Sequence, residues 1–341
     1  MGKAPFVSII IPVFGAEDYI ESCLNSVVSQ DYSGEIECIL VDDCGKDSSM
    51  KRAHKFIDNY KGVISFSILC HGISKGAAAA RNTGIRHARG EYILFLDSDD
   101  CLTKDAISIL SAPLLISRFD MVVGRYQEIG DRNGKGFSLP DNTLLEGKDI
   151  LYHYLESHIP VVVWNKLIKK SLIFNNQLFF LEGVIFEDNL WSFGASIVSQ
   201  TLYVVDKITY LYLIRNGSVM TSTPINKQLL SYRLVVSGMY SLTVVHQLKR
   251  NKYCHHYIEC FRRRYFKMLC DDYRAFKSEY IALRRVLSKP WWDCFIMNAF
   301  HPLKQIRDFH LLFPPFWGAG LYLIYVRYVY YGALVRLKRT Q

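Results

Sequence analysis

The chain has 341 residues, of which 50% are hydrophobic and 21% are charged. This composition can bury a sizeable core in one large or two ordinary domains, and it excludes a disordered chain. The net charge of +9 is uneven, because residues 245–341 carry 18 Lys and Arg against 6 Asp and Glu. Such a basic region is typical of proteins that meet nucleic acid or an anionic membrane surface.

The N-terminus and the cysteines indicate a reducing compartment. Met1 is followed by Gly2 and Lys3 and then by a strand-like run, which lacks the pattern of a signal peptide. We therefore expect the protein to stay on the cytoplasmic side. The nine cysteines include no Cys-x-x-Cys pair, which argues against a disulfide framework or a zinc ribbon and for reduced, mostly buried thiols.

Strand and helix patterns alternate over residues 1–125. Five apolar runs are short enough for strands of a parallel sheet: Val7–Val13, Cys38–Asp42, Val63–Leu69, Tyr92–Asp97 and Asp120–Val123. Four segments between them have helical spacing: Ile20–Gln30, Ser48–Tyr60, Gly76–Ala88 and Lys104–Ile116. Ser48 and Thr103 are the expected N-caps. This alternation predicts an α/β fold with a doubly wound, mostly parallel sheet and helices on both faces.

The pattern changes after this region. Residues 126–148 are rich in Gly, Asp and Asn, which indicates a loop or an insertion, and residues 149–215 return to mixed structure. Pro224–Ser288 is helical and basic, and Trp291–Val335 is strongly aromatic. We therefore predict an α/β domain over residues 1–223 and a helical, basic, aromatic-rich region over residues 224–341.

Ligands of a doubly wound sheet collect outside the carboxyl ends of the strands, and here those ends are acidic. Asp97, Asp99 and Asp100 follow the apolar run Tyr92–Leu96. Carboxylates on alternate residues suit Mg²⁺ or Mn²⁺ bridged to phosphates, so we predict a divalent metal at Asp97 and Asp99. The alternative is that Asp97 and Asp100 cap the helix that begins near Lys104.

Two further segments fit a nucleotide diphosphate. Asp42 and Asp43 end the second strand, where a carboxylate can accept a hydrogen bond from a uracil N–H or a ribose hydroxyl. An ordinary turn is the alternative. Lys75, Arg81 and Asn82 lie in a Gly- and Ala-rich helix start, where cations can meet a diphosphate. A well-packed helix with one surface arginine is the alternative.

Taken together, these segments resemble a family 2 glycosyltransferase of the kind that builds bacterial surface polysaccharides. Five blocks carry the resemblance in the family's order: Val7–Val13, Val41–Ser48, Gly76–Gly84, Gly90–Leu102 and Phe186–Asp188. The D-S-D-D sequence of residues 97–100 is the most specific part. The resemblance implies a Rossmann-like, glycosyltransferase A-type fold, with the nucleotide-sugar-binding and catalytic domain over residues 1–223.

The resemblance also implies roles for single residues. Asp42 or Asp43 would hold the uracil or the ribose, Asp97 and Asp99 would handle the ribose and the metal, and Asp188 would be the general base. The matching blocks add three residues on the nucleotide-sugar side: Pro12, Val13 and Ser98. They add Glu187 on the acceptor or diphosphate side. The family usually has Gly-Ser where this chain has Cys44-Gly45-Lys46.

A base is needed because the acceptor hydroxyl is a poor nucleophile, and the metal would offset charge on the departing diphosphate. One side-chain base and one in-line attack predict inversion at the anomeric carbon. A solvent-facing helix start is the alternative for Glu187 and Asp188. Two further segments resemble the acceptor side, so Trp164 is a candidate to stack on a sugar, and Lys166 and Arg215 to meet phosphates. A core aromatic and surface cations are the alternatives.

The C-terminal region has no Asp, Glu, Lys or Arg from Phe309 to Val326. Pro314-Pro315 breaks the front of this run and Arg327 follows it, which favours an interfacial, aromatic-rich helix over a spanning one. Arg336, Lys338 and Arg339 would then lie at an anionic membrane surface. Packing as the last helix of a soluble domain, or as a dimer interface, is the alternative.

The predicted function is metal-dependent, inverting transfer from a nucleotide-diphosphate sugar, expected to be a UDP-sugar, to a lipid-linked saccharide at the inner face of the cell membrane. The alternative enzyme is a sugar-phosphate nucleotidyltransferase, but Phe14–Asp18 lacks its Gly-rich, Arg-containing loop. A nucleic-acid-binding protein would need exposed aromatics among its cations, and only Arg262–Arg264 offers a cluster. We therefore expect no nucleic-acid partner. The sugar, the acceptor and the oligomeric state stay open.

Overall fold

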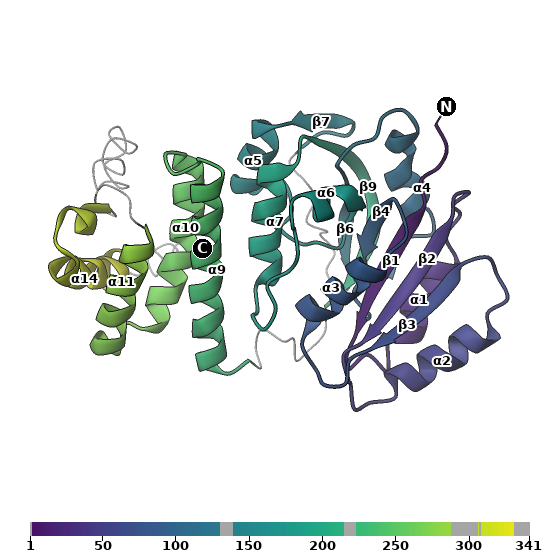
Figure 1. Ribbon diagram of the computed structural model, residues 1–341, viewed down its shortest axis with the longest axis horizontal. Helices are drawn as coiled ribbons and strands as arrows, with labels where there is room; N and C mark the ends of the chain where they lie inside the picture. Colours follow the sequence, from purple (N-terminus) through teal and green to yellow (C-terminus); the bar gives the residue numbers. More distant parts are fainter. Residues whose placement is uncertain (1, 130–138, 215–222, 288–305, 307, 331–341) are drawn as a thin grey trace. The chain divides into compact units, whose positions relative to one another are not determined.

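The computed structural model describes residues 2–129, 139–214, 223–287, 306 and 308–330. It divides into two compact units, residues 1–222 and residues 223–341. Figure 1 draws the first in purple to teal and the second in green to yellow. We name them the α/β unit and the helical unit.

The α/β unit is built on a nine-stranded sheet with the order β3-β2-β1-β4-β8-β6-β9-β5, and β7 pairs with β9 (Figure 1). The strands are β1 (Val7–Val13), β2 (Ile36–Asp42), β3 (Ser65–Cys70), β4 (Tyr92–Phe95), β5 (Cys101–Leu102), β6 (Met121–Ile129), β7 (Thr143–Glu146), β8 (Lys166–Lys169) and β9 (Thr201–Leu213). Strands β3, β2, β1 and β4 are parallel, as are β6 and β9. The predicted α/β class with a mostly parallel sheet is confirmed.

Antiparallel β8 joins the two parallel halves, because it pairs with β4 on one side and β6 on the other. The sequence gives little sign of this strand. It has four residues with a lysine at each end, and its central Leu167 and Ile168 are buried by neighbours distant in the chain.

The helices of this unit are α1 (Ile20–Val28), α2 (Ser49–Asn59), α3 (Ala77–His87), α4 (Ala106–Ser111), the 3₁₀ helix η1 (Ala112–Leu115), α5 (Lys148–Leu155), α6 (Lys170–Asn175) and α7 (Glu187–Val198). The helix predicted over Lys104–Ile116 is split, because Pro113 lacks the N–H that an α-helix needs. Ser48 occupies the N-cap position of α2 without a side-chain capping bond, and the Thr103 hydroxyl instead donates to Ile208 O.

Close packing of α3 on the sheet sets the position of Arg81. Gly84 faces Ile10 of β1, and a Cβ atom at Gly84 would overlap the side chain of Ile10. The absent side chain lets α3 approach β1 and β2 closely. Arg81, one turn earlier on α3, is thereby held near the carboxyl end of the sheet.

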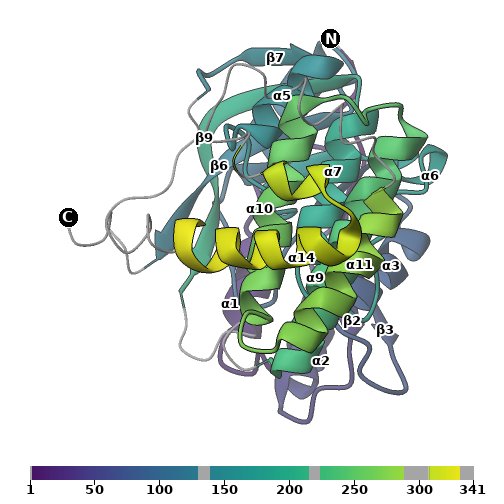
Figure 2. The same ribbon diagram turned by 90° about the vertical axis from the view of Figure 1, so that its left-hand side faces the viewer.

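The helical unit contains α9 (Ile225–Val245), α10 (Lys252–Met268), α11 (Tyr273–Leu287), the 3₁₀ helix η2 (Phe309–Leu312), α14 (Pro315–Ile324) and the π-helical η3 (Tyr325–Tyr330). This confirms the predicted helical region. Figure 2 shows α14 crossing α11. Tyr322 of α14 is fully buried against the rings of Phe266, Phe276 and Tyr280.

The burial of one arginine and the length of the helices bear on the predicted nucleic-acid and membrane contacts of the helical unit. Arg262 is 2% exposed and forms an ion pair with Glu259, whereas Arg264 is exposed, so the three arginines do not all face solvent. Among the residues that the structure describes, no helix combines the length and the apolar character required to cross a membrane.

Candidate active site

The strand order of the sheet reverses beside β1, since β2 and β3 lie on one side of β1 and β4 lies on the other. In doubly wound sheets, ligands bind outside the carboxyl ends of the strands at such a switch point. The carboxyl ends of β1 and β4 lead into residues 14–19 and 96–100. The D-S-D-D block of residues 97–100 therefore lies at the switch point.

Arg81 connects this block to the helix that carries Glu187 and Asp188. Its Nη2 donates to Asp97 Oδ1 (2.8 Å) and its Nη1 to Glu187 Oε1 (2.9 Å). Burial alone would lower the pKa of Arg81, but the two carboxylates raise it above its usual value. Arg81 is 6% exposed, so it is not the surface arginine of the alternative. Two carboxylates engage its Nη atoms in this structure, and its contact with the donor diphosphate stays a prediction.

The three carboxylates of the block differ in their surroundings. The side chain of Asp97 is 27% exposed and Asp99 is partly exposed, whereas Asp100 is 1% exposed. Asp100 accepts hydrogen bonds from the Tyr210 hydroxyl (2.6 Å) and from Leu213 N (2.8 Å). Burial, followed by the charge of Asp97, raises the pKa of Asp100 to about 8. No side chain caps the start of α4, so the helix-capping alternative is wrong.

The donor set fits a phosphate-bridged metal. The described part of the chain has no group of three or more His, Cys, Asp or Glu side chains that could hold a metal by itself. Mg²⁺ that also binds phosphates needs only one or two protein carboxylates. Asp97 and Asp99 meet that need as partly exposed oxygen donors, whereas Asp100 uses both carboxylate oxygens within the protein.

The two aspartates at the end of β2 also differ. Asp43 is 2% exposed and accepts four hydrogen bonds of 2.7–2.8 Å from the loop before α3, from His71, Ser74, Lys75 N and Gly76 N. Burial alone would raise the pKa of Asp43, but these bonds lower it. Asp42 is partly exposed and accepts from Cys44 N (3.0 Å). Asp43 therefore organises the loop, and Asp42 is the more accessible of the two.

Asn82 is occupied in a similar way. It is 1% exposed, and its amide exchanges hydrogen bonds with the backbone of Phe180 and donates to Glu182. This corrects the prediction that Asn82 contacts the nucleotide sugar, because its amide holds the loop before α7. Lys75 is exposed at the start of α3.

Three predicted nucleotide-side residues offer little side-chain surface. Val13 and Ser98 are buried, and Pro12 is partly exposed. The carbonyl of Val13 accepts from Asp43 N (3.0 Å). Any contact of Val13 with a nucleotide would therefore involve its backbone.

Glu187 and Asp188 begin α7, where a helix favours negative charge. Phe186, just before them, has a left-handed backbone (φ 67°), which is uncommon outside glycine and concentrates at functional sites. Asp188 Oδ1 accepts from the backbone and side-chain nitrogens of Asn189 (2.8 and 2.7 Å). Burial and then the charge of Glu187 raise the pKa of Asp188 to about 6. Such a carboxylate is mostly ionised at neutral pH and more basic than an ordinary aspartate.

Trp164 and Lys166 lie in the core. Trp164 is 7% exposed and stacks on the rings of Tyr210 and Tyr212, with centres 4.2 and 5.5 Å away. These rings cover it, so the predicted stacking on a sugar is wrong and the core-aromatic alternative is right.

Lys166 is 3% exposed, and its ammonium donates to three internal acceptors: Pro160 O, Val162 O and Asn165 Oδ1. Burial lowers its pKa to about 7, and the charge of Asp188 acts in the opposite direction. Both the phosphate contact and the surface-cation alternative are therefore wrong for Lys166. Arg215 lies outside the described residues.

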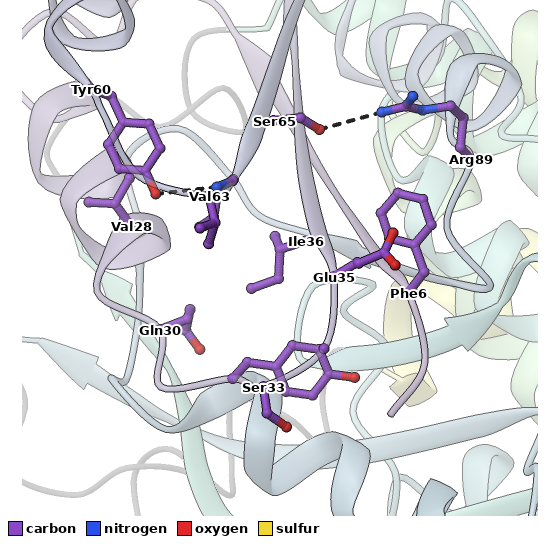
Figure 3. Close-up of a pocket in the computed structure, with 13 residues that line it drawn as sticks. Phe6, Val28, Gln30, Ser33, Glu35, Ile36, Tyr60, Val63, Ser65 and Arg89 are labelled. Carbon is purple, nitrogen blue, oxygen red and sulfur yellow. Dashed lines mark hydrogen bonds between the residues drawn. The ribbon is translucent and has the colours of Figure 1, made fainter. Parts of the chain in front are cut away.

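A pocket of about 400 Å³ lies at the other edge of the sheet (Figure 3). Phe6, Ile36 and Ser65 line it at the starts of β1, β2 and β3, and Tyr60 and Arg89 stand at its sides. Because strand starts and strand ends lie at opposite edges of a parallel sheet, this pocket is separate from the D-S-D-D block.

Comparison with known families matches residues 8–170 to the family described as Glycosyl transferase family 2. The α/β unit is a family 2 glycosyltransferase domain. This confirms the resemblance carried by the sequence blocks. We refer to residues 1–222 from here on as the glycosyltransferase unit.

Curated proteins similar to this chain are named as glycosyltransferases. Glycosyltransferase GlyA of Streptococcus pneumoniae is 27% identical over 62% of this chain, and the uncharacterized glycosyltransferase EpsJ of Bacillus subtilis is 31% identical over 64%. A poly(ribitol-phosphate) beta-glucosyltransferase of Bacillus spizizenii is 31% identical over 63%. The matches span 31%, 64% and 33% of these three relatives, respectively.

The solved structure of Staphylococcus aureus TarS 1–349 in complex with UDP-GlcNAc has a similar fold. It matches with a TM-score of 0.72 and 20% identity, over 96% of this chain and 92% of that one. The likeness agrees with a glycosyltransferase A-type unit followed by a helical region.

Proposed function

We propose that this protein is an inverting glycosyltransferase that moves a sugar from a UDP-sugar to a saccharide acceptor, with Mg²⁺ or Mn²⁺ as its cofactor. The observation that carries the proposal is the bridge made by Arg81. It brings Asp97 of the D-S-D-D block and Glu187, the neighbour of Asp188, to two sides of one guanidinium. The D-S-D-D block, which we propose binds the donor, and the start of α7, which carries the proposed base, are thereby linked at the switch point of the sheet.

Asp188 is the proposed general base. It accepts the proton of the acceptor hydroxyl as the hydroxyl oxygen attacks the anomeric carbon. The bond from that carbon to the diphosphate breaks, and its electron pair leaves with the diphosphate. One in-line displacement inverts the configuration. Glu187 is paired with Arg81, so Asp188 is the acid at the start of α7 that is left to act as base.

The donor site would use residues on the same edge of the sheet. Asp42 is proposed to accept a hydrogen bond from the uracil N–H, and Lys75 to meet the diphosphate at the start of α3. Asp97 and Asp99 would hold the metal, which when bound offsets charge on the departing diphosphate. The complex of TarS with UDP-GlcNAc supports a uridine donor for this fold.

A lipid-linked saccharide of surface polysaccharide synthesis is the proposed acceptor, reached from the inner face of the cell membrane. On α14, Phe316 and Trp317 are 60% and 69% exposed, whereas Ala319 and Tyr322 are buried. The Lys277 ammonium lies 3.3 Å from the centre of the Phe316 ring. Exposed aromatic rings beside cations are typical of helices that lie on anionic membranes.

The donor site is tested by replacing Asp99 with Asn. Titration of UDP into the wild type by calorimetry should give tighter binding with Mn²⁺ than with a chelator. Asp99→Asn should lose this Mn²⁺-dependent gain, because an amide oxygen is a weaker ligand for a hard cation than a carboxylate.

Asp105→Asn is the matched control, since Asp105 is an exposed aspartate six residues along the chain that makes no capping bond to α4. It should keep the Mn²⁺ dependence of the wild type. Equal UDP affinity with Mn²⁺ and with chelator in the wild type would contradict the metal assignment, and a lack of UDP binding altogether would contradict the proposed donor.

A further inference from the structure

The hydroxyl of Tyr210 spans the D-S-D-D block. It donates to Asp100 Oδ2 (2.6 Å) and accepts from Asp97 N (3.2 Å). Asp100 N also donates to Asp97 O (3.0 Å), which closes the block as a turn. One hydroxyl therefore contacts both ends of the segment that contains the proposed metal ligands.

The position of this hydroxyl is set independently of the block. The Tyr210 side chain is 1% exposed and stacks on Trp164 at 4.2 Å and 16°. Trp164 in turn meets the ring of Tyr126 edge-on at 4.9 Å. The backbone of Tyr210 pairs with Leu102 of β5 on one side and with Tyr126 of β6 on the other. Because ring and backbone are both fixed, the block takes its shape from Tyr210.

Asp100 also helps to fix the shape of the D-S-D-D block. Its two carboxylate oxygens accept from the Tyr210 hydroxyl and from Leu213 N, both on β9. It is 1% exposed, whereas Asp97 and Asp99 are partly exposed. The buried acid therefore anchors the block to β9, and the two more exposed acids face the ligand side.

We propose that Tyr210 is a positioning residue that, together with Asp100, holds Asp97 and Asp99 in the arrangement that binds the donor diphosphate. This rests on the proposed function and adds a residue to its donor site. Without the hydroxyl, Asp97 N loses its acceptor and Asp100 loses a donor. Buried polar groups left unpaired are unfavourable, so the turn should rearrange. Donor binding should then weaken, although Asp188 is untouched.

Tyr210→Phe tests the proposal, with Tyr212→Phe as the matched control. Both tyrosines lie on β9 and stack on Trp164, but the hydroxyl of Tyr212 makes none of the contacts to the block. Calorimetry with UDP and Mn²⁺ should give a Kd about tenfold or more higher for Tyr210→Phe, as expected when the buried groups Asp97 N and Asp100 Oδ2 lose their hydrogen-bond partner. Tyr212→Phe should stay within about twofold of the wild type.

Steady-state kinetics adds a readout that a purely structural role would not move. Tyr210→Phe should raise KM for the sugar donor and leave KM for the acceptor unchanged. If Tyr210→Phe binds UDP as tightly as the wild type, measured well below its melting temperature, the hydroxyl stabilises the fold only and the positioning role is overturned.

Asp100→Asn provides a second variant, because asparagine keeps an acceptor for Leu213 N but cannot also accept from the Tyr210 hydroxyl. It should weaken UDP binding about as much as Tyr210→Phe does, yet still bind UDP more tightly with Mn²⁺ than with a chelator, a gain that Asp99→Asn should lose. Loss of the Mn²⁺ dependence in Asp100→Asn as well would make Asp100 a metal ligand and overturn the proposal. Lack of UDP binding by the wild type would instead overturn the proposed function, and the positioning role with it.

Discussion

At the scale of single residues, the surroundings of Asp188 predict how activity depends on pH. Burial and the charge of Glu187 raise its pKa from 3.8 to about 6, and the base must be ionised to accept a proton. As pH falls through about 6, kcat/KM should therefore fall, by about tenfold per unit on the acid side, and it should level off above. Asp188→Asn should lower transfer by about two to four orders of magnitude. Its UDP affinity, measured by calorimetry, should match that of the wild type.

Glu187→Gln tests whether the charge of Glu187 raises the pKa of Asp188. Glutamine keeps an acceptor for Arg81 but removes the negative charge beside Asp188. The fall of kcat/KM on the acid side, which we call the acid limb, should therefore move to lower pH. A limb that does not move in Glu187→Gln would show that Glu187 does not set the pKa. A limb that persists in Asp188→Asn would assign the proton to another group.

At the scale of elements, Arg81 joins α3, the loop after β4 and the start of α7. Arg81→Lys cannot form the fork that reaches two carboxylates, so Asp97 or Glu187 loses its partner. Breaking a buried pair costs roughly 3–5 kcal/mol, and partial exposure of both acids should reduce this to about 2 kcal/mol. Chemical denaturation at pH 7 measures the change.

Arg86→Lys is the control for this element. Arg86 is an exposed cation on the same helix, with its guanidinium 5.0 Å from the centre of the Phe179 ring. Its replacement should change the free energy of unfolding by no more than about 0.5 kcal/mol. Equal stability losses for Arg81→Lys and Arg86→Lys would mean that the bridge contributes nothing specific.

At the scale of the whole molecule, α14 presents two faces. Tyr322 packs inside the helical unit, as the alternative of a last soluble helix expects, and the exposed rings lie on the same helix. Replacing Phe316 and Trp317 together with Ser should weaken binding to anionic liposomes by about tenfold or more, since each large apolar side chain contributes roughly 1.5–3 kcal/mol when buried. Sedimentation with liposomes measures the bound fraction. Binding by the wild type should also weaken as salt rises, because charges are screened within about 8 Å at physiological ionic strength.

Ile116→Ser is the control for this surface, because Ile116 is 91% exposed in the glycosyltransferase unit. It should bind liposomes like the wild type. Unchanged liposome binding in the Phe316 and Trp317 double variant would indicate that the exposed face of α14 contacts protein and not the membrane. Wild-type binding that resists both salt and alkaline carbonate would instead indicate a spanning segment.

Local pattern in the sequence was sufficient for the alternating strands and helices, and for the position of the D-S-D-D block. A buried strand of a parallel sheet must be apolar along its length, and the acids that follow it must lie at the carboxyl edge. This is why β1, β2 and β4 were predicted within a few residues. The short β8 was missed, because its burial comes from strands on both sides.

The roles within the site were decided by the tertiary structure. Asp97 and Asp100 look alike in the sequence, yet Asp100 is bonded to Leu213, 113 residues away, and Asp97 is not buried. Asn82 and Lys166 are likewise engaged by backbone groups of loops. A sequence states which donors and acceptors a chain carries. Which of them are already paired with each other depends on contacts between distant segments, and those contacts leave only some groups available to a ligand.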